Sequence, residues 1–513
     1  MNIIPLPNLY RRLPGSFLVP EELAVNYSQE LAPTAQLLEN FIKNTTGVNI
    51  KKSLHSQLNL TLDFSLENEQ YHILVDESNI HLAARTNRGA FYGLQTLKQL
   101  IKQKGSHYYI DSVFIDDRPR FSYRGFMLDV ARHFFPKEDI FRLIDIISFH
   151  KLNVLHLHLT DDQGWRIESE KYPHLTEIGS IRNTTYSRKN KKINFPHYGY
   201  YTKNDLKDIV SYAKERHIEV IPEIDMPGHM NALIAAYPDT SCLKSKISVR
   251  ENFGISDITL CPGNNEVYKM LTDIILETFD IFESPYFHIG GDEVPKKHWK
   301  KCPLCQHKIK ENNLKNEKEL ATFFTNYFCE LLIAHNKIPI IWNDGISSKL
   351  SARAVLQHWK MFTRKKSTKE INRGRKAIIS DFAYFYLDYP YGMTPLKKTY
   401  QFEPIPKGVH NKDNILGIEA PLWTEWVRDR DKMDFQIFPR LTAIAETAWT
   451  ESQNKSYEDF VNRLEPFYQY YRKMNVKFAQ NVTFSPALIK RFFATLSWLR
   501  DENSEYNKNG VMK

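Results

Sequence analysis

The chain has 513 residues, of which 42% are apolar and 25% are charged, and its formal net charge is +9. This is the composition of an ordinary globular protein longer than one average domain, which excludes a disordered or fibrous chain. Much of the positive charge falls in two runs, Lys296–Lys310 and Arg364–Lys376. Neither run alternates with aromatic residues as a nucleic-acid-binding surface does, so we expect no nucleic acid partner.

Redox and targeting signals predict a soluble protein. The five cysteines, an odd and low number for this length, do not describe a disulfide framework. Residues 1–10 lack the basic start, the apolar core and the small-residue cleavage site of a secretory signal. No apolar stretch is long enough to span a membrane. We therefore expect a cytoplasmic protein without a membrane partner, whose oligomeric state the sequence leaves open.

Residues 1–118 predict a small α+β domain. Three segments alternate apolar and polar residues, as half-buried strands do: Gln57–Phe64, Tyr71–Val75 and Ile80–Ala84. Thr86–Ile101 follows with apolar residues at helical spacing, and Ser112–Ile115 is a candidate last strand. The Asp-Arg-Pro-Arg sequence at 117–120 then suggests a hinge into the next unit.

The next part of the chain changes to short apolar runs separated by amphipathic helices. Uninterrupted apolar runs are typical of strands that are covered on both faces. The helix expected at Pro136–Phe149 begins with proline, and that at Thr202–Arg216 begins with a Thr-x-x-Asp capping box. Eight alternations, closed by a final helix at Asp434–Trp449, predict a (β/α)8 barrel. The candidate strands are Tyr123–Leu128, Val154–Leu159, Glu219–Ile224, Tyr286–Ile289, Ile338–Trp342, Ala354–Gln357, Lys376–Ile379 and Ile415–Ile418.

The predicted fold is therefore α/β, a (β/α)8 TIM barrel over residues 119–475 that is preceded by the smaller α+β domain. Residues 476–513 are expected to form a C-terminal helical extension, with a helix over Ser485–Leu499, and a polar tail. In such barrels the active site lies at the carboxyl ends of the strands. The residues at and after each candidate strand are therefore the candidates for chemistry.

Acids, a histidine and indole rings accompany these strands. A sugar ring needs this combination, because its apolar face packs on aromatic rings while its hydroxyls bond to carboxylates. The candidates, in strand order, are Arg124 and Asp129, Asp161 and Asp162, Glu223, Asp225 and His229, His288, Asp292 and Glu293, Trp342 and Asp344, Trp359, Tyr386 and Asp388, and Trp423 and Glu425.

The adjacent pair Asp292 and Glu293 is the sharpest catalytic signal. It follows His-Ile-Gly-Gly at the end of the fourth candidate strand, where two glycines free the backbone. An ordinary retaining glycosidase holds two carboxyls about 5 Å apart, one on each side of the anomeric carbon, which adjacent side chains are poorly placed to do. One carboxyl can instead protonate the leaving oxygen while the other holds the substrate's own 2-acetamide, whose carbonyl oxygen attacks the anomeric carbon. The pair therefore indicates substrate-assisted hydrolysis of an N-acetylated sugar.

Six segments carry long motifs. They are Gly89–Leu97 in the N-terminal unit and, along the barrel, Arg124–Phe134, His156–Arg166, Pro222–His229, His288–Glu293 and Glu419–Glu425. These motifs closely resemble those of family 20 glycoside hydrolases, the β-N-acetylhexosaminidases, in the order of that family. The resemblance extends over most of residues 1–475, and so many long motifs in one order are very specific.

The resemblance implies a role for each matching residue. Glu293 is the general acid and later the base, and Asp292 orients the acetamide. Asp161 and His229 form a supporting pair that holds the surroundings of Glu293. The substrate-binding residues are Arg124 for the 3- and 4-hydroxyls, Glu425 for the 4- and 6-hydroxyls, Tyr386 for the acetamide carbonyl, Asp388 for the 6-hydroxyl, and Trp342, Trp359 and Trp423 as aromatic walls. The fifth-strand end, Trp342-Asn-Asp-Gly, and the stretch around Trp359 depart from the family pattern.

The activity implied is that of an exo-acting, retaining β-N-acetylhexosaminidase. Its substrate would be an oligosaccharide or glycoconjugate with a terminal β-linked GlcNAc or GalNAc, and the intermediate would be an oxazolinium ion. This chemistry needs no cofactor and no metal. The sequence does not choose between GlcNAc and GalNAc and does not reveal the aglycone.

Three other interpretations stay open at this point. His156-x-His158 on a strand also begins the metal site of amidohydrolases, which would need further ligands such as His229, His288 or Asp344. The chain could also be a non-catalytic lectin on a hydrolase scaffold, although such a protein typically lacks the catalytic acid. Separately, the segment that holds His298, Cys302, Cys305 and His307 could bind a structural zinc ion, although the short intervals make four ligands hard to wrap around one ion.

Overall fold

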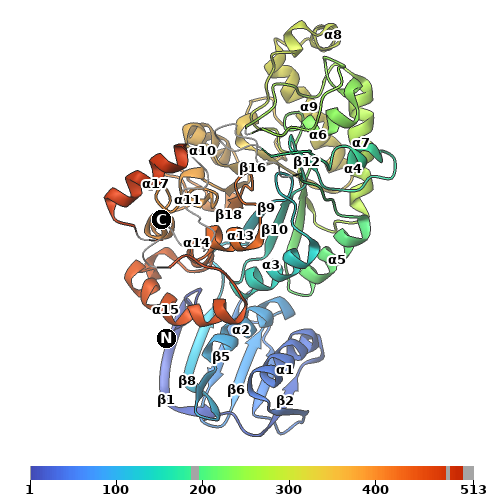
Figure 1. The fold of residues 1–513 in the computed structure, drawn as a ribbon. Coiled ribbons are helices and arrows are strands. Elements are labelled where there is room, and N and C mark those ends of the chain that lie inside the picture. The colour runs from blue at the N-terminus through green and yellow to red at the C-terminus, as the bar shows by residue number, and fades with distance from the viewer. Residues whose placement is uncertain (1, 186–195, 253, 481–483, 485, 501–513) are drawn as a thin grey trace.

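A computed structural model describes residues 2–185, 196–252, 254–480, 484 and 486–500. An N-terminal sheet with two helices forms one end of the molecule, and a (β/α)8 barrel forms the rest (Figure 1). In the described part of the chain, no helix combines the length and the apolar character that crossing a membrane would need.

The N-terminal sheet has the strand order β1-β8-β5-β6-β4-β2-β3, with β7 paired to β8. Helix α1 (Ala32–Thr46) packs against α2 (Asn87–Leu100), which lies on β5 and β6. The sequence analysis predicts β4, β5, β6, α2 and part of β8 but misses β1, β2, β3, β7 and α1. The residues of β1 are mostly exposed and leave no apolar alternation. The strands are β1 (Leu9–Leu18), β2 (Glu22–Tyr27), β3 (Asn49–Lys52), β4 (Leu58–Leu62), β5 (Tyr71–Val75), β6 (Ile80–Ala84), β7 (Lys102–Lys104) and β8 (His107–Asp117).

The barrel closes in the order β10-β13-β14-β15-β16-β17-β18-β9, and every neighbouring pair is parallel. All eight predicted strands are present, which confirms the predicted fold class. The strands are β9 (Tyr123–Asp129), β10 (Val154–His158), β13 (Glu219–Glu223), β14 (Tyr286–His288), β15 (Ile338–Trp342), β16 (Val355–His358), β17 (Ala377–Ile379) and β18 (Ile415–Leu422). A short hairpin of β11 (Thr160–Asp161) and β12 (Gly164–Trp165) follows β10.

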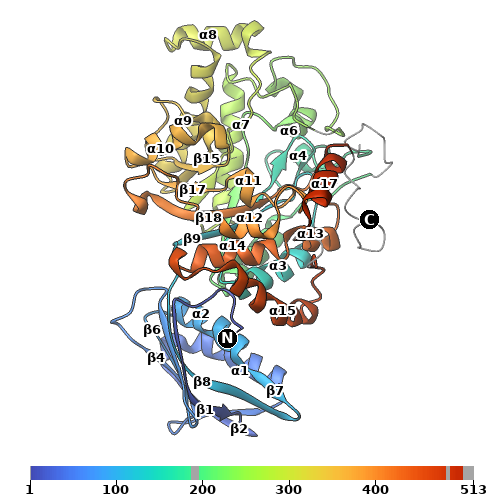
Figure 2. The same ribbon diagram turned by 90° about the vertical axis from the view of Figure 1, so that its left-hand side faces the viewer.

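Helices surround the barrel and extend it at both ends (Figures 1 and 2). Most of their apolar faces pack on the strands and form one large core. They are α3 (Lys137–Phe149), α4 (His174–Glu177), α5 (Lys203–Lys214), α6 (Asn231–Ala236), α7 (Asn265–Phe279), α8 (Pro303–Glu311), α9 (Glu317–Ala334), α10 (Arg364–Asn372), α11 (Phe382–Phe385), α12 (Leu396–Gln401), α13 (Arg430–Ile437), α14 (Arg440–Trp449), α15 (Tyr457–Lys473) and α17 (Leu488–Arg500).

The predicted capping box of α5 is present, because Thr202 and Asp205 exchange hydrogen bonds between side chain and backbone. The predicted final helix is wrong in one respect. Residues 434–449 are not one helix, since α13 ends at Ile437 and α14 begins at Arg440. Pro439 lies between them, and proline both lacks an amide donor and forces the preceding residue out of helical geometry.

The N-terminal sheet is joined to the barrel by buried polar contacts. Trp449, at the end of α14, packs in the core of the N-terminal unit, and its indole N–H donates to Asp117 at 3.0 Å. Lys151 forms a fully buried ion pair with the same carboxylate at 3.0 Å. Arg463 of α15 pairs with Glu446 of α14 through two bonds of 2.7 Å and donates to the carbonyl of Ile3. These contacts fix the two units against one another.

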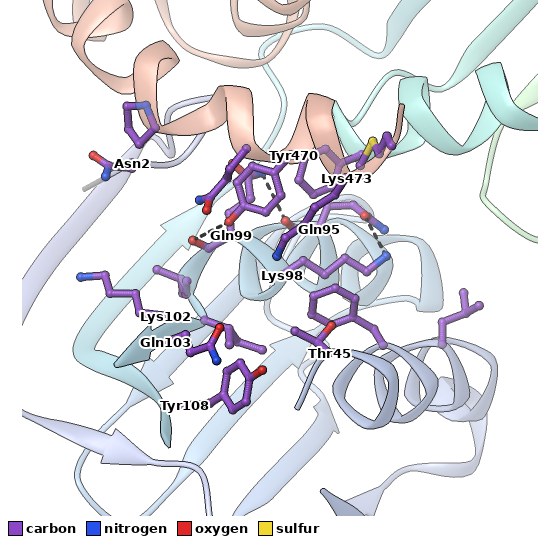
Figure 3. Close-up of a pocket in the computed structure, with 18 of the residues that line it drawn as sticks. Asn2, Thr45, Gln95, Lys98, Gln99, Lys102, Gln103, Tyr108, Tyr470 and Lys473 are labelled. Carbon is purple, nitrogen blue, oxygen red and sulfur yellow. Dashed lines mark hydrogen bonds between the residues drawn. The ribbon is translucent and has the colours of Figure 1, made fainter. Parts of the chain in front are cut away.

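A cavity of about 740 Å³ lies at this junction, between α1, α2 and α15 (Figure 3). Lys98, Gln99 and Tyr470 line it, and the Tyr470 hydroxyl donates to the Gln99 carbonyl. Ser148 and Phe149, which precede strand β10, also line it. The cavity therefore lies at the amino-terminal side of the barrel, away from the strand ends where the acid pair lies.

Candidate active site

The acid pair lies on a tight turn after β14 whose backbone requires glycine. Gly290 has φ +64°, and a Cβ there would lie 1.7 Å from the carboxylate oxygen of Asp225. That carboxylate accepts a hydrogen bond of 2.9 Å from the Gly291 amide. Glu293 and His229 adopt φ of +45° and +54°, which is unusual for residues with side chains. Backbone strain held by its surroundings in this way is typical of a functional site.

Asp292 and Glu293 occupy different environments although they are adjacent. The Asp292 side chain is buried, and its Oδ1 has no hydrogen-bond partner among the described residues. The Glu293 side chain is 36% exposed, and the Lys360 ammonium lies 3.7 Å from its Oε1. The Asp344 carboxylate connects Glu293 to Lys360. It accepts one hydrogen bond from the Glu293 amide at 3.1 Å and another from the Lys360 ammonium at 2.6 Å. Sequence reasoning did not assign Lys360, which enters the site from the loop after β16.

The environment of Asp292 raises its pKa. Burial is the largest cause, the His229 cation opposes it, and the charges of Glu293 and Asp344 add to it, so that the pKa of Asp292 is raised to about 6. At neutral pH this carboxylate is ionised, buried and equipped with an unused acceptor oxygen. It can accept a hydrogen bond from a substrate N–H or stabilise a nearby positive charge.

Asp161 and His229 form the predicted pair, but they contact Asp292. His229 Nδ1 lies 3.2 Å from Asp161, and its Nε2 lies 3.6 Å from Asp292 Oδ2. Burial disfavours the charged imidazole, but Asp161 and Asp292 outweigh this and raise the pKa of His229 well above its usual range. The pair therefore contacts the neighbour of Glu293, and its expected support of the surroundings of Glu293 stays a prediction. The link from Asp161 through His229 ends on the acetamide-orienting candidate, Asp292, and keeps it ionised.

A column of alternating histidines and carboxylates continues this link down the barrel interior. His158 bonds to Asp161 at 2.8 Å and to Glu223 at 2.5 Å, and His156 lies 3.1 Å from Glu223 and 3.0 Å from Glu419. Burial opposes the charge of both imidazoles, but their carboxylate partners outweigh it and raise the pKa of each to about 10. Both ring nitrogens of each histidine therefore face carboxylates, which disfavours the amidohydrolase interpretation of His-x-His.

Aromatic rings line one side of the site. Trp342 and Trp423 have ring centroids 5.9 Å apart, Tyr386 lies 6.3 Å from Trp423, and Trp359 stacks on Tyr386 at 6.1 Å. Trp342 is almost fully buried and donates its indole N–H to Glu223 at 2.8 Å, so it forms the base of this wall. Burial raises the pKa of Tyr386 well above its usual range, which keeps the phenol neutral and able to donate a hydrogen bond. The four rings predicted from sequence are thus brought together.

Asp388 and Glu425 are also brought to this rim. Asp388 lies close enough to Tyr386 to contribute to its raised pKa. Burial raises the pKa of Glu425, which the nearby Arg132 cation opposes and Asp161 reinforces. Their predicted contacts with individual hydroxyls stay predictions.

Arg124 lies at the wrong end of its strand for the role predicted from sequence. It is the second residue of β9, is fully buried, and pairs with Glu69 of the N-terminal unit at 2.8 Å. Its guanidinium also lies over the rings of Tyr92 and Trp449, each with a centroid 5.1 Å away. The prediction that Arg124 contacts the substrate is therefore wrong, because the side chain fastens the two units together.

Arg132 is the guanidinium at the mouth of the barrel. It follows β9, bonds to Asp161 at 2.7 Å and to Asp129 at 3.3 Å, and lies 4.9 Å from the ring centroid of Trp423. Sequence reasoning missed it even though it belongs to the same motif. The position of the two arginines relative to the strand was the available signal, since only a residue near the carboxyl end can reach the site.

Replacing Arg124 with methionine should lower stability and leave substrate affinity unchanged. Breaking a buried ion pair leaves a charge without its partner, and we expect a loss of about 3 kcal/mol in the free energy of unfolding. Denaturant titration of the Arg124→Met and Arg124→Met/Glu69→Gln variants checks this, and the double variant should lose less than the sum of the single changes. A raised KM at unchanged stability would return Arg124 to the substrate site.

Comparisons with known proteins agree with this arrangement. The model for glycosyl hydrolase family 20, domain 2, matches residues 1–118, and that for the family 20 catalytic domain matches residues 121–452. A β-hexosaminidase of Porphyromonas gingivalis is 35% identical over 91% of this chain, which spans only 62% of that relative's length. A β-hexosaminidase of Akkermansia muciniphila is 34% identical, over 89% of this chain and 90% of its own.

A solved structure shows the same architecture. The family 20 exo-β-N-acetylglucosaminidase from Vibrio harveyi, in complex with N-acetylglucosamine, superposes with a TM-score of 0.85 at 29% identity, covering 93% of this chain and 78% of that one. The resemblance of the sequence motifs is thereby confirmed. Since the catalytic-domain model covers well over half of the chain and the site residues lie at the mouth of its barrel, the protein belongs to glycosyl hydrolase family 20.

Proposed function

We propose that the protein is an exo-acting, retaining β-N-acetylhexosaminidase that uses the acetamide of its substrate as the nucleophile. The substrate is an oligosaccharide or glycoconjugate that ends in β-linked GlcNAc or GalNAc. The names of the relatives and the N-acetylglucosamine complex of the Vibrio harveyi enzyme support an amino-sugar substrate. Since the chain is shorter than the Porphyromonas gingivalis relative, the proposal concerns the barrel and the domain before it.

The observation that carries the proposal is the buried, unpartnered Oδ1 of Asp292. A buried carboxylate oxygen without a donor is costly, so its presence in a site points to a ligand that brings one. The amide N–H of a 2-acetamido sugar is such a donor, and the neighbouring Tyr386 can donate to the carbonyl of the same amide. The rings of Trp342 and Trp423 then provide the apolar surface against which the methyl group and the sugar face pack.

The proposed reaction has two steps. Glu293 gives its proton to the glycosidic oxygen while the bond to the aglycone breaks, and the acetamide oxygen bonds to the anomeric carbon. The aglycone leaves as an alcohol, and Asp292 stabilises the positive oxazolinium ion. Glu293, now ionised, takes a proton from water. The water oxygen then bonds to the anomeric carbon, and the bond from that carbon to the acetamide oxygen breaks, which opens the oxazolinium ring. Two inversions at that carbon return the β configuration.

Hydrolysis of p-nitrophenyl β-GlcNAc, compared with that of p-nitrophenyl β-glucose, tests the proposal. We expect cleavage of the first compound only, because glucose lacks the acetamide, and strong inhibition by a thiazoline analogue of GlcNAc, which mimics the oxazolinium ion. The β-GalNAc compound then measures the preference at the 4-hydroxyl. Binding without turnover would favour the lectin interpretation, and equal cleavage of the glucoside would contradict the role of the acetamide.

The rate should fall on the acid side of the pH profile as Asp292 takes up a proton. Its pKa is raised to about 6 by burial, so below that pH the neutral carboxyl neither accepts the N–H well nor stabilises the oxazolinium ion. The titratable groups around it include His229, Glu293, Asp344, Glu223 and Asp225. A profile of kcat/KM against pH for wild type and for Asp292→Asn checks the assignment. The same acid limb in both proteins would show that another group titrates.

A further inference from the structure

Four cysteine sulfurs meet close to the loops that carry the acid pair. All four Sγ atoms of Cys242, Cys261, Cys302 and Cys305 lie within 4.8 Å of one another. Cys305 Sγ is 3.6 Å from the sulfurs of both Cys242 and Cys261, and Cys261 Sγ is 3.7 Å from that of Cys302. A tetrahedral zinc ion bound by four thiolates at about 2.3 Å holds its sulfurs about 3.8 Å apart. The observed spacing is therefore that of a tetrahedral metal site.

A pair of disulfides would leave a different arrangement. A disulfide brings two sulfurs to about 2.05 Å and separates each pair from the other. Here Cys261 and Cys305 each approach two other sulfurs at nearly equal distances, so the geometry singles out no pairing. All four residues are free thiols in the structure, and three of them are buried. Four thiols that converge on one point fit a shared ion better than two separate bonds.

The backbone around the cluster is shaped for this approach. Cys302 is the N-cap of α8 and Cys305 lies in its first turn, where the helix dipole favours a thiolate. Gly263 packs directly on this turn, because a Cβ there would lie 2.3 Å from the Cys305 amide nitrogen. The two loops thus approach to the distance that a shared ion needs.

The charge of the segment also fits. Four thiolates around zinc(II) carry a net charge of about −2, which nearby cations stabilise. The run Lys296–Lys310 contains six lysines and no acidic residue. Along the sequence, these lysines therefore flank Cys302 and Cys305 on both sides. His298 and His307, the other two ligands considered from sequence, are not members of the group, and His307 is exposed.

We infer that Cys242, Cys261, Cys302 and Cys305 bind one structural zinc ion. The ion ties the loops after α6 and before α7 to the start of α8, which stands at the end of the molecule farthest from the N-terminal sheet (Figures 1 and 2). The glycosidase chemistry proposed above does not pass through this ion.

The site has a direct structural link to the acid pair. Trp299, fully buried, packs with the cysteines and donates to the Leu260 carbonyl at 3.0 Å. Val294, the residue after Glu293, packs on the same small core. The Leu260 amide in turn donates to the carbonyl of Pro227, two residues before His229. The zinc ion thus holds the segments on which Glu293 and His229 are mounted.

The metal content of the protein, purified without chelator, tests the inference. We expect about one zinc per chain, as for other four-thiolate sites. Cys302→Ser and Cys261→Ser should lose most of it. Cys329→Ser is the matched control, because Cys329 is equally buried but lies in α9 outside the cluster, and it should keep the metal. His307→Ala should keep it as well. Cobalt(II) put in place of zinc should show the sulfur-to-metal charge-transfer band of a thiolate site.

A wild-type measurement covers the case in which the serine variants do not fold. Titration of the native protein with a mercurial reagent should release the zinc as four thiols react, and the melting temperature should fall when a chelator removes the ion. If the protein purified without chelator contains no metal and all five of its thiols can be alkylated, the inference is overturned. A mass that shows disulfides would overturn it as well, and bound iron would overturn the assignment to zinc.

Discussion

Glu293→Gln should lose most of its activity on substrates with a sugar leaving group and much less on p-nitrophenyl β-GlcNAc. A positioned general acid contributes about 10²–10⁴-fold, and an amide cannot supply the proton. A nitrophenolate departs without protonation, so its release depends less on Glu293. The measurement is kcat/KM for chitobiose and for the aryl glycoside in wild type and variant. Glu283→Gln, an exposed change just before β14, is the matched control and should match wild type.

The same variant tests the second half of the reaction. If Glu293 also activates water, the variant should accumulate the oxazolinium intermediate with the aryl substrate, and azide should restore turnover by attacking without a base. Equal losses on both substrates, without rescue by azide, would remove Glu293 from the role of acid. Lys360, 3.7 Å from Glu293, would then be the next proton donor to replace.

Asp292→Asn should lose activity on every substrate, activated or not. The change keeps the size of the side chain but removes the charge that stabilises the oxazolinium ion, and the loss of one preorganised electrostatic contact costs about 10²–10³-fold in kcat. The affinity for the thiazoline analogue should fall in parallel, because the same contact binds it. Asp280→Asn, an exposed change at the end of α7, should have no effect. An unchanged rate in Asp292→Asn would remove the residue from the mechanism.

Asp292→Asn should also be more stable than wild type at neutral pH. Burial raises the pKa of Asp292 from the usual value of about 3.9 to about 6, so between these values the native state binds more protons than the unfolded state. The favourable contribution of the neutral carboxyl is fully present below about pH 4 and is lost as the pH rises through about 6. The melting temperature of the variant should exceed that of wild type at pH 7, and the difference should shrink toward pH 4.

The sequence predicts those elements of the fold and the site that have a pattern in their own local sequence. The eight barrel strands are buried on both faces and stand out as apolar runs, whereas β1, an exposed edge strand, has no such pattern. Pro439 separates α13 from α14, whereas the apolar spacing of residues 434–449 alone predicts one helix. The acid pair was found because glycines and a strand end precede it.

Contacts between distant segments account for what was missed. Arg124 and Arg132 are eight residues apart in one motif, and only their places along β9 separate a residue that joins the two units from one at the site. Cys242 and Cys261 lie about 40 to 60 residues before Cys302 and Cys305, so no spacing rule connects them. Lys360 is followed by a basic run in which nothing marks it as a neighbour of Glu293.

The histidine–carboxylate column beneath the site restricts how this barrel can change. Tyr123 and Gln357 complete it below, where both donate to Glu419, so that each member neutralises or bonds to the next. A single replacement, for instance of Glu223, would leave one ring nitrogen of His156 and one of His158 without its carboxylate partner. A buried polar group without a partner is one of the changes that destabilise a protein most. Members of the column can therefore be exchanged only in groups, whether by natural drift or by redesign. Substitutions meant to change the substrate of this barrel are therefore best made at its rim and not along its axis.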